Sequence, residues 1–76
     1  MVLYMRFQPA WNISRLQDYI NVRGKITNVE DLHSKLSKWG ELQGYKRNLE
    51  SYILETYHPI ENREAEVEIY LPIHRN

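Results

Sequence analysis

The stretch "TNVEDLHSKLSKWGELQGY", from Thr27 to Tyr45, carries the clearest structural pattern in this sequence. Its apolar residues recur at spacings of three and four, which places them on one face of a helix; they are Val29, Leu32, Leu36 and Trp39. Polar and charged residues cover the other side of that helix. The pattern predicts an amphipathic helix that lies on a sheet.

Both ends of this helix carry recognisable signals. Thr27 with Glu30 fits a capping box, in which each side chain binds the other residue's backbone N–H, and Asn28 with Asp31 is a rival cap one residue later. Gly44 stands where a left-handed residue commonly ends a helix. The helix is therefore expected to end before Gly44.

Two strands are expected before the helix. The segment "VLYMRF" (Val2–Phe7) is rich in β-branched and aromatic residues, and Pro9 follows it closely, where proline removes a ladder donor. The segment "RLQDYINVR" (Arg15–Arg23) alternates with strand period, and Gly24 closes it. Asp18 falls in the apolar phase of this strand, so we expect a β-bulge there.

Two further strands are expected after the helix. Lys46–His58 reads as one long strand, Pro59–Ala65 as a turn, and "EVEIYLPI" as a final strand with one unbroken apolar face, made of Val67, Ile69, Leu71 and Ile73. The two late strands would form a hairpin. The sequence thus predicts an α+β fold, a small antiparallel sheet in the order β-β-α-β-β with one helix packed on one face.

Length and composition limit what this chain can be. A chain of 76 residues forms a single domain, here residues 1–76, and buries about 60% of its unfolded surface, so its core is marginal unless the protein is oligomeric. The sequence has no cysteine, which excludes disulfides and thiolate metal sites and fits a reducing cytoplasm.

Charge and hydropathy limit the kinds of partner that this chain is expected to bind. Ten Lys and Arg balance ten Asp and Glu, so no overall field draws the chain to nucleic acid or to an anionic membrane. No apolar run reaches the roughly 18 residues of a membrane span, and the start "MVLYMRF" lacks the pattern of a signal peptide. We expect a soluble, cytoplasmic protein without direct nucleic-acid or membrane contact.

Motifs for catalysis, metals and cofactors are not found in the sequence. The three histidines lack the spacing of metal ligands, the three glycines stand alone rather than in a phosphate-binding loop, and no serine lies in a Gly-x-Ser-x-Gly turn. The basic pair in "YKR" beside Tyr45 reads as a solvated strand entrance rather than a single-strand nucleic-acid site. We therefore expect no metal, no cofactor and no catalytic residue.

The segment "ILETYHPIENREAEVEIYLPI" contains two Glu-x-Tyr triplets. Glu55 shares a strand face with Tyr57, and two interpretations stay open. Glu55 is either a partly exposed glutamate paired across the ladder, with Arg15 or Arg23, or a carboxylate walled by aromatic rings that receives a cation. Glu68 lies opposite the apolar face of its strand, and a solvated role fits it better.

Several short motifs resemble the second half of the GyrI-like effector-binding domain, which is found at the C-terminus of MerR- and AraC-type multidrug-responsive regulators and as a stand-alone protein. The resemblance covers roughly residues 13–73 and includes "RLQDYINVRG" before the helix. It rests on a helical Leu-x-x-Trp, a Gly-Tyr exit, a strand Glu-x-Tyr and a terminal Tyr-x-Pro-Ile; these are Leu36 and Trp39, Gly44 and Tyr45, Glu55 and Tyr57, and Tyr70, Pro72 and Ile73.

The resemblance implies a ligand site. In that family two repeats pack side by side, and at their junction a strand glutamate neutralises cationic aromatic drugs while tyrosines stack around it. By resemblance Glu55 is that glutamate, and we expect Tyr57, Tyr52, Tyr19 and Trp11 to line the site. The chain departs from the family in having one repeat, no helix-turn-helix and Gly24-Lys25-Ile26 in place of a Gly-Pro-Tyr motif.

The functional expectation follows from this single repeat. We expect a non-catalytic protein that binds an amphipathic, cationic small-molecule effector and pairs as a homodimer to complete the pocket. The alternative is a protein-interaction module, like a gyrase inhibitor or a regulator-docking domain, without a small-molecule site. Hydrolase activity, which the resemblance also suggests for some members, is a weaker expectation.

Overall fold

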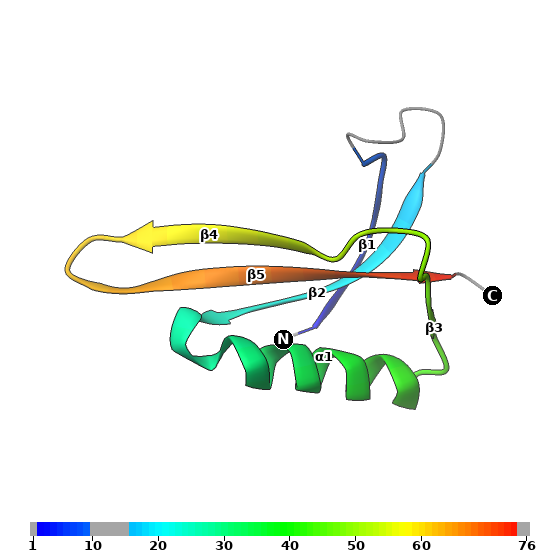
Figure 1. Ribbon diagram of the computed structural model, residues 1–76, viewed down its shortest axis with the longest axis horizontal. Helices are drawn as coiled ribbons and strands as arrows, with labels where there is room; N and C mark the ends of the chain where they lie inside the picture. Colours follow the sequence, from blue (N-terminus) through cyan, green and yellow to red (C-terminus); the bar gives the residue numbers. More distant parts are fainter. Residues whose placement is uncertain (1, 10–15, 75–76) are drawn as a thin grey trace.

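The computed structural model describes residues 2–9 and 16–74. Its elements are β1 (Leu3–Phe7), β2 (Gln17–Lys25), a short 3-10 turn η1 (Ile26–Asn28), α1 (Val29–Leu42), β3 (Lys46–Arg47), β4 (Leu54–Ile60) and β5 (Arg63–His74). The strands form one five-stranded antiparallel sheet, and α1 lies along one of its faces (Figure 1). The predicted α+β class, with one helix on an antiparallel sheet, is confirmed, and the element order differs from the predicted one by one additional strand after the helix.

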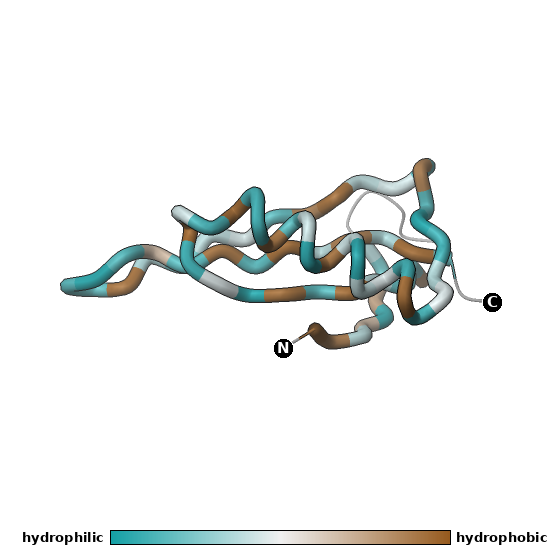
Figure 2. Tube along the Cα trace, turned by 90° about the horizontal axis from the view of Figure 1, so that it is seen from below, coloured by the Kyte–Doolittle hydropathy of each residue, from teal (hydrophilic) through white to brown (hydrophobic). Residues whose placement is uncertain are grey.

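The longest strand, β5, organises the sheet. One side of β5 pairs with β2, whose other side pairs with β1. The other side of β5 pairs with β3 near its C-terminal end and with β4 toward the hairpin. Within the described residues, β1 and β4 therefore have free outer edges. The tip of the β4–β5 hairpin extends past the N-terminal end of α1 (Figures 1 and 2).

The core lies between α1 and the sheet. Its buried residues are Leu32 and Leu36 from α1, Ile20 and Val22 from β2, and Val67, Ile69, Leu71 and Ile73 from β5. These are the apolar faces that the sequence pattern predicts, and Leu36 is only 1% exposed. Trp39 packs against this cluster but stays partly buried, with its ring centroid 6.1 Å from that of Tyr45.

Two glycines bring the helix and β2 close together. A Cβ added to Gly24 would lie 2.8 Å from Cδ2 of Leu32, and one added to Gly40 would lie 3.0 Å from Cδ1 of Ile20. Side chains at these positions would push the two layers apart. The helical glycine thus has a packing role that compensates for its low helix propensity.

The N-terminal end of α1 differs from the expected capping box. The N-cap is Asn28, and no side chain caps the helix. The backbone N–H of Thr27 instead donates to the Glu64 carboxylate of β5, at 2.9 Å. The start of the helix is therefore fixed by the sheet rather than by a local cap, and the Thr27–Glu30 prediction is wrong.

The C-terminal end of α1 is as expected. Gly44 has a φ of 79°, and its N–H donates to the Glu41 carbonyl at 3.0 Å. The N–H of Tyr45 donates to the Gly40 carbonyl at the same distance of 3.0 Å. These two bonds form a Schellman motif, and the Tyr45–Trp39 ring contact supplies the apolar contact that accompanies it.

The predicted long strand Lys46–His58 is interrupted. β3 covers Lys46–Arg47 and β4 begins at Leu54. Between them the Asn48 side-chain oxygen accepts a 3.0 Å hydrogen bond from the N–H of Glu50, and the Asn48 N–H donates to the Pro72 carbonyl at 3.0 Å. A side chain that binds the backbone two residues on favours a turn, which explains the break.

The hairpin turn is tighter than predicted. β4 runs to Ile60 and β5 begins at Arg63, so the turn is Glu61–Asn62 rather than Pro59–Ala65. Asn62 adopts a φ of 63°, which asparagine tolerates better than most residues. Pro59 falls at the irregularity between His58 and Ile60, on the free edge where proline is accommodated.

The expected bulge at Asp18 is also wrong. The pairing of β2 with β1 and with β5 continues through Asp18 without a register shift. The carboxylate accepts a hydrogen bond from the Tyr4 hydroxyl, and the Arg6 guanidinium lies 3.6 Å away. These partners on β1 allow the Asp18 carboxylate to occupy a strand position that the alternation assigns to apolar side chains.

No helix of the described residues is long and apolar enough to cross a membrane.

Candidate functional site

The two Glu-x-Tyr triplets lie on opposite faces of the sheet. Glu55 is opposite Ile69 in the β4–β5 ladder, and Ile69 belongs to the core beneath α1. Glu68 is the neighbour of Ile69 on β5 and therefore points to the face without a helix. The two carboxylates cannot belong to one site.

Glu55 has partners from two elements. Nε2 of His33, on α1, lies 3.0 Å from Oε1, and the Tyr57 hydroxyl donates to Oε2 at 2.8 Å. The hydrogen bond with His33, followed by that from Tyr57, outweighs desolvation and holds the pKa of Glu55 below its ordinary value. The same contact with Glu55 raises the pKa of Tyr57. The Glu55 side chain remains 32% exposed.

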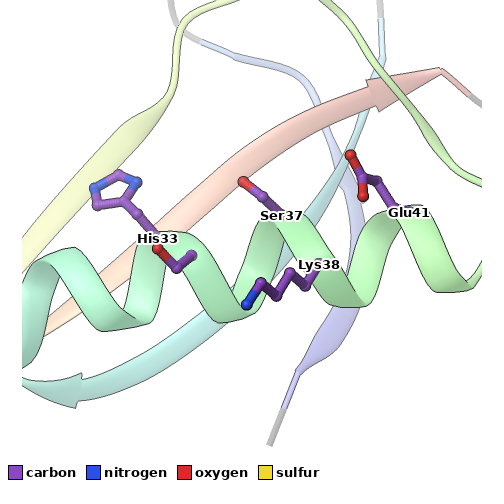
Figure 3. Close-up of a pocket in the computed structure, with 5 residues that line it drawn as sticks. His33, Ser37, Lys38 and Glu41 are labelled. Atoms are coloured by element: carbon purple, nitrogen blue, oxygen red, sulfur yellow. The ribbon is translucent and has the colours of Figure 1, made fainter.

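Two shallow hollows, of about 420 and 440 Å³, lie along α1 beside this cluster and share Ser37 and Glu41 in their walls. Glu55 itself lines neither hollow, and His33 connects it to the first. The first also includes His33, Ser34 and Lys38; the second also includes Gly40, Tyr45, Lys46, Arg47, Leu71 and Ile73. In Figure 3 the side chains of His33, Ser37 and Glu41 rise from the same side of the helix. We call the two joined hollows the helix groove.

Glu68 is the centre of a hydrogen-bond network on the helix-free face. Oε2 accepts from Asn21 Nδ2 at 2.8 Å and from the Tyr70 hydroxyl at 3.1 Å, while His58 Nε2 lies 2.8 Å from Oε1. Arg23 Nη1 is 3.9 Å away. The side chain is 20% exposed, less than that of Glu55. The solvated interpretation of Glu68 is therefore wrong.

The pKa of Glu68 reflects this network. Desolvation by burial would raise the pKa, but the hydrogen bonds from Tyr70, His58 and Asn21 together outweigh it and hold the pKa below its ordinary value. Burial, followed by the contact with Glu68, raises the pKa of Tyr70. Three hydrogen-bond partners and the nearby Arg23 guanidinium surround the Glu68 carboxylate, whereas Glu55 has two partners, so Glu68 is a stabilising group of the sheet rather than a free receptor for a cation.

Aromatic residues cluster on the same helix-free face. Tyr19 is fully buried, stacks on Phe7 with a centroid distance of 4.5 Å and meets Tyr70 edge-on at 6.4 Å. Burial raises the pKa of Tyr19, whose hydroxyl has no hydrogen-bond partner among residues 2–9 and 16–74. This ring supports the sheet from the side opposite Glu55.

The structure thus separates the residues expected to line one site. Glu55 and Tyr57 are in contact, whereas Tyr19 lies on the other face. Tyr52 lies in the connection between β3 and β4 and is 67% exposed. Trp11 lies outside the described residues. The sequence pattern missed His33, because its contact with Glu55 depends on where α1 lies relative to β4.

The described part of the chain has no group of three or more His, Asp or Glu residues that could hold a metal ion. Comparisons with protein-family models, with curated proteins and with solved structures find no match to this chain. The resemblance to GyrI-like domains therefore stays a prediction, and the geometry around Glu55 is the feature of the described residues from which a function can be inferred.

Proposed function

We propose that this protein is a non-catalytic binding protein for amphipathic cations, that Glu55 supplies the counter-charge, and that two copies pair to complete the pocket. The observation that carries the proposal is the Glu55 carboxylate, held by His33 and Tyr57 and still one-third exposed next to the helix groove. The cysteine-free sequence fits a reducing cytoplasm, where we propose that the protein acts.

Glu55 retains capacity for a ligand. A carboxylate offers about four acceptor positions, and the His33 and Tyr57 contacts use one on each oxygen. Its lowered pKa keeps it ionised at neutral pH. A cation placed there would gain the charge of Glu55 and the face of the Tyr57 ring, and cation–π contacts contribute about 0.5–2 kcal/mol.

The second hollow offers a small apolar surface to the rest of such a ligand. Its lining includes the half-buried Tyr45, with the core residues Leu71 and Ile73, 6% and 2% exposed, beneath. An amphipathic organic cation can bury its apolar part along the groove while its charge stays near Glu55.

Pairing of two copies would close this site. β4 pairs with β5 and with no other described strand, so its outer edge is free, and Glu55 and Tyr57 are both on β4. A twofold interface along that edge would place two copies of Glu55 in one cleft. The implied family resemblance, in which two repeats form the site at their junction, supports the same arrangement.

Binding of tetraphenylphosphonium tests the proposal, with tetraphenylborate as a ligand of the same shape and opposite charge. Isothermal titration calorimetry should give saturable binding of the phosphonium at micromolar to millimolar concentration, and at least tenfold weaker binding of the borate. Equal binding of both ions would indicate a general apolar surface, and no saturable binding of the phosphonium would refute the proposal.

A second candidate function is a protein-interaction module, and the free edge of β1 favours it. Leu3, Tyr4 and Met5 are 49%, 41% and 37% exposed on this edge strand. An exposed apolar edge of this kind can accept an extended segment of a partner as a sixth strand. Met5→Lys would weaken such docking and leave phosphonium binding unchanged, whereas Glu55→Gln would have the reverse effect.

A further inference from the structure

We infer that the helix groove takes a zwitterionic amphiphile, with its cationic group at Glu55 and its anionic group at Arg47. This inference depends on the proposed function, because it uses the same Glu55 site and names the class of ligand more narrowly. The groove has an acidic end next to His33 and a basic end at β3. An apolar floor lies at the basic end.

The basic end is formed by β3. Arg47 is opposite Ile73 in the ladder, so its side chain lies on the same sheet face as α1. Lys46 and Arg47 both line the second hollow and are exposed. Within the described residues neither side chain forms an ion pair, whereas Arg6 and Arg23 both do. Arg47 is therefore available to an anionic group on the helix side of the sheet.

The acidic end carries the opposite charge. Glu55 is held 3.0 Å from His33, which lines the first hollow. His33 adds a positive charge only when it is protonated, so with neutral His33 this end has one net negative charge. The two ends of the groove thus differ in sign.

The helix sets the distance between the two ends. Glu41 is eight positions after His33 on α1, and a rise of 1.5 Å per residue makes this about 12 Å along the helix. A ligand that reaches both ends must therefore separate its charges by roughly this length. Compact zwitterions such as glycine betaine are too short.

Glu41 and Lys38 lie between the two ends of the groove, and their charges also act on a bound ligand. Glu41 lines both hollows, and Lys38 lines the first. Glu41 and Lys38 have opposite charges in the middle of the groove, which leaves Arg47 as the cation of the basic end. Charge complementarity therefore selects a ligand that is cationic at one end, uncharged in the middle and anionic at the other end.

A matched ligand series tests this inference. Trimethylammonio-undecanoate carries its charges at opposite ends of a long alkyl chain, undecyltrimethylammonium lacks the carboxylate, and trimethylammonio-acetate lacks the chain. We expect the long zwitterion to bind about fivefold more tightly than the monocation, as for one additional partly exposed ion pair. The short zwitterion should bind too weakly to measure.

Two variants locate the added affinity. Arg47→Gln should remove the advantage of the long zwitterion over the monocation. Lys35→Gln is a matched control, since it removes one positive charge from an exposed position of α1 that lines neither hollow. It should leave the advantage intact. Circular dichroism would verify that both variants are folded.

The outcomes separate this inference from the proposed function. If binding of the monocation depends on Glu55 but the long zwitterion binds no more tightly than the monocation, the proposed function stands and the assignment of an anionic group to Arg47 is wrong. An advantage that persists in Arg47→Gln would also overturn the inference. If neither long-chain ligand binds, both ideas fail.

Discussion

Nε2 of His33 lies 3.0 Å from Oε1 of Glu55 and joins the helix layer to the edge strand β4. Apart from this contact α1 packs mainly on β2 and β5. The pair therefore stands where the helix stops covering the sheet, at the border between core and solvent. In this position Glu55 is fixed by its hydrogen bonds and its carboxylate stays accessible to solvent.

The first prediction concerns this pair and its counterpart on the other face. His33→Ala should raise the pKa of Glu55, since the hydrogen bond from His33 is the largest cause of its lowering. His58→Ala should leave the pKa of Glu55 unchanged and raise that of Glu68. NMR titration of the side-chain carboxyl carbons would measure both. A shift of the same glutamate in both variants would show that the two faces are assigned wrongly.

The second prediction concerns the core. Leu36 is 1% exposed at the centre of the helix face, so Leu36→Ala should lower the free energy of unfolding by about 2–5 kcal/mol. Trp39 is only partly buried at the margin, and Trp39→Ala should cost less than Leu36→Ala. Urea denaturation of both variants checks the order. A larger loss for Trp39→Ala would place the centre of the core near Tyr45 instead.

The third prediction concerns acid sensitivity. The folded-state pKa of Glu68 is lower than its ordinary value of 4.5, so its stabilising contribution is fully present above pH 4.5 and is lost as the pH falls through the folded-state pKa. Glu68→Gln should therefore lower the free energy of unfolding by about 1–2 kcal/mol at pH 7, with several donors left poorly matched.

The matching measurement compares wild type and Glu68→Gln across pH. The difference in their melting temperatures should shrink steadily below pH 4.5, because the wild-type carboxylate also loses its charge there. Glu61→Gln, in the exposed hairpin turn, should show no comparable difference at any pH. A gap between wild type and Glu68→Gln that stays constant down to pH 2 would contradict the network.

The fourth prediction concerns assembly. If two copies of Glu55 share one cleft, a bound organic cation relieves their repulsion and favours the dimer. Saturating tetraphenylphosphonium should then strengthen dimerisation, by up to about 2.7 kcal/mol at a ligand concentration 100 times its dissociation constant. Sedimentation equilibrium measures this shift, which Glu55→Gln should abolish. A monomer at high micromolar concentration, with or without ligand, would rule out the shared cleft.

The fold could be predicted largely from local patterns. The three- and four-residue spacing around Leu36 predicts the helix, and the alternation from Val67 to Ile73 predicts the core face of β5. The predictions for the helix cap and for the bulge are wrong because contacts with residues far along the chain determine the local structure there. The Thr27 N–H binds Glu64, and Asp18 is stabilised by Tyr4 and Arg6; neither contact has a signature in the neighbouring sequence.

The candidate site could be predicted only in part, for the same reason. Strand phase places Glu55 and Tyr57 on one face, and the structure has them in contact. Whether that face meets the helix depends on strand order, because both faces of the segment mix apolar and polar residues. The expectation that Tyr19 lines the same site does not use strand phase and is wrong, because the register of β2 against β5 places Tyr19 on the opposite face.

The role of Glu55 as counter-charge is tested most directly by the affinity of tetraphenylphosphonium for Glu55→Gln, measured by calorimetry beside wild type and Glu61→Gln. Glutamine keeps the size of the side chain and removes its charge, so we expect a folded protein whose binding of the cation is weaker by about 1–3 kcal/mol. Glu61→Gln should bind as wild type does. Equal affinity of Glu55→Gln and wild type for the phosphonium would show that Glu55 is not the counter-charge of the site.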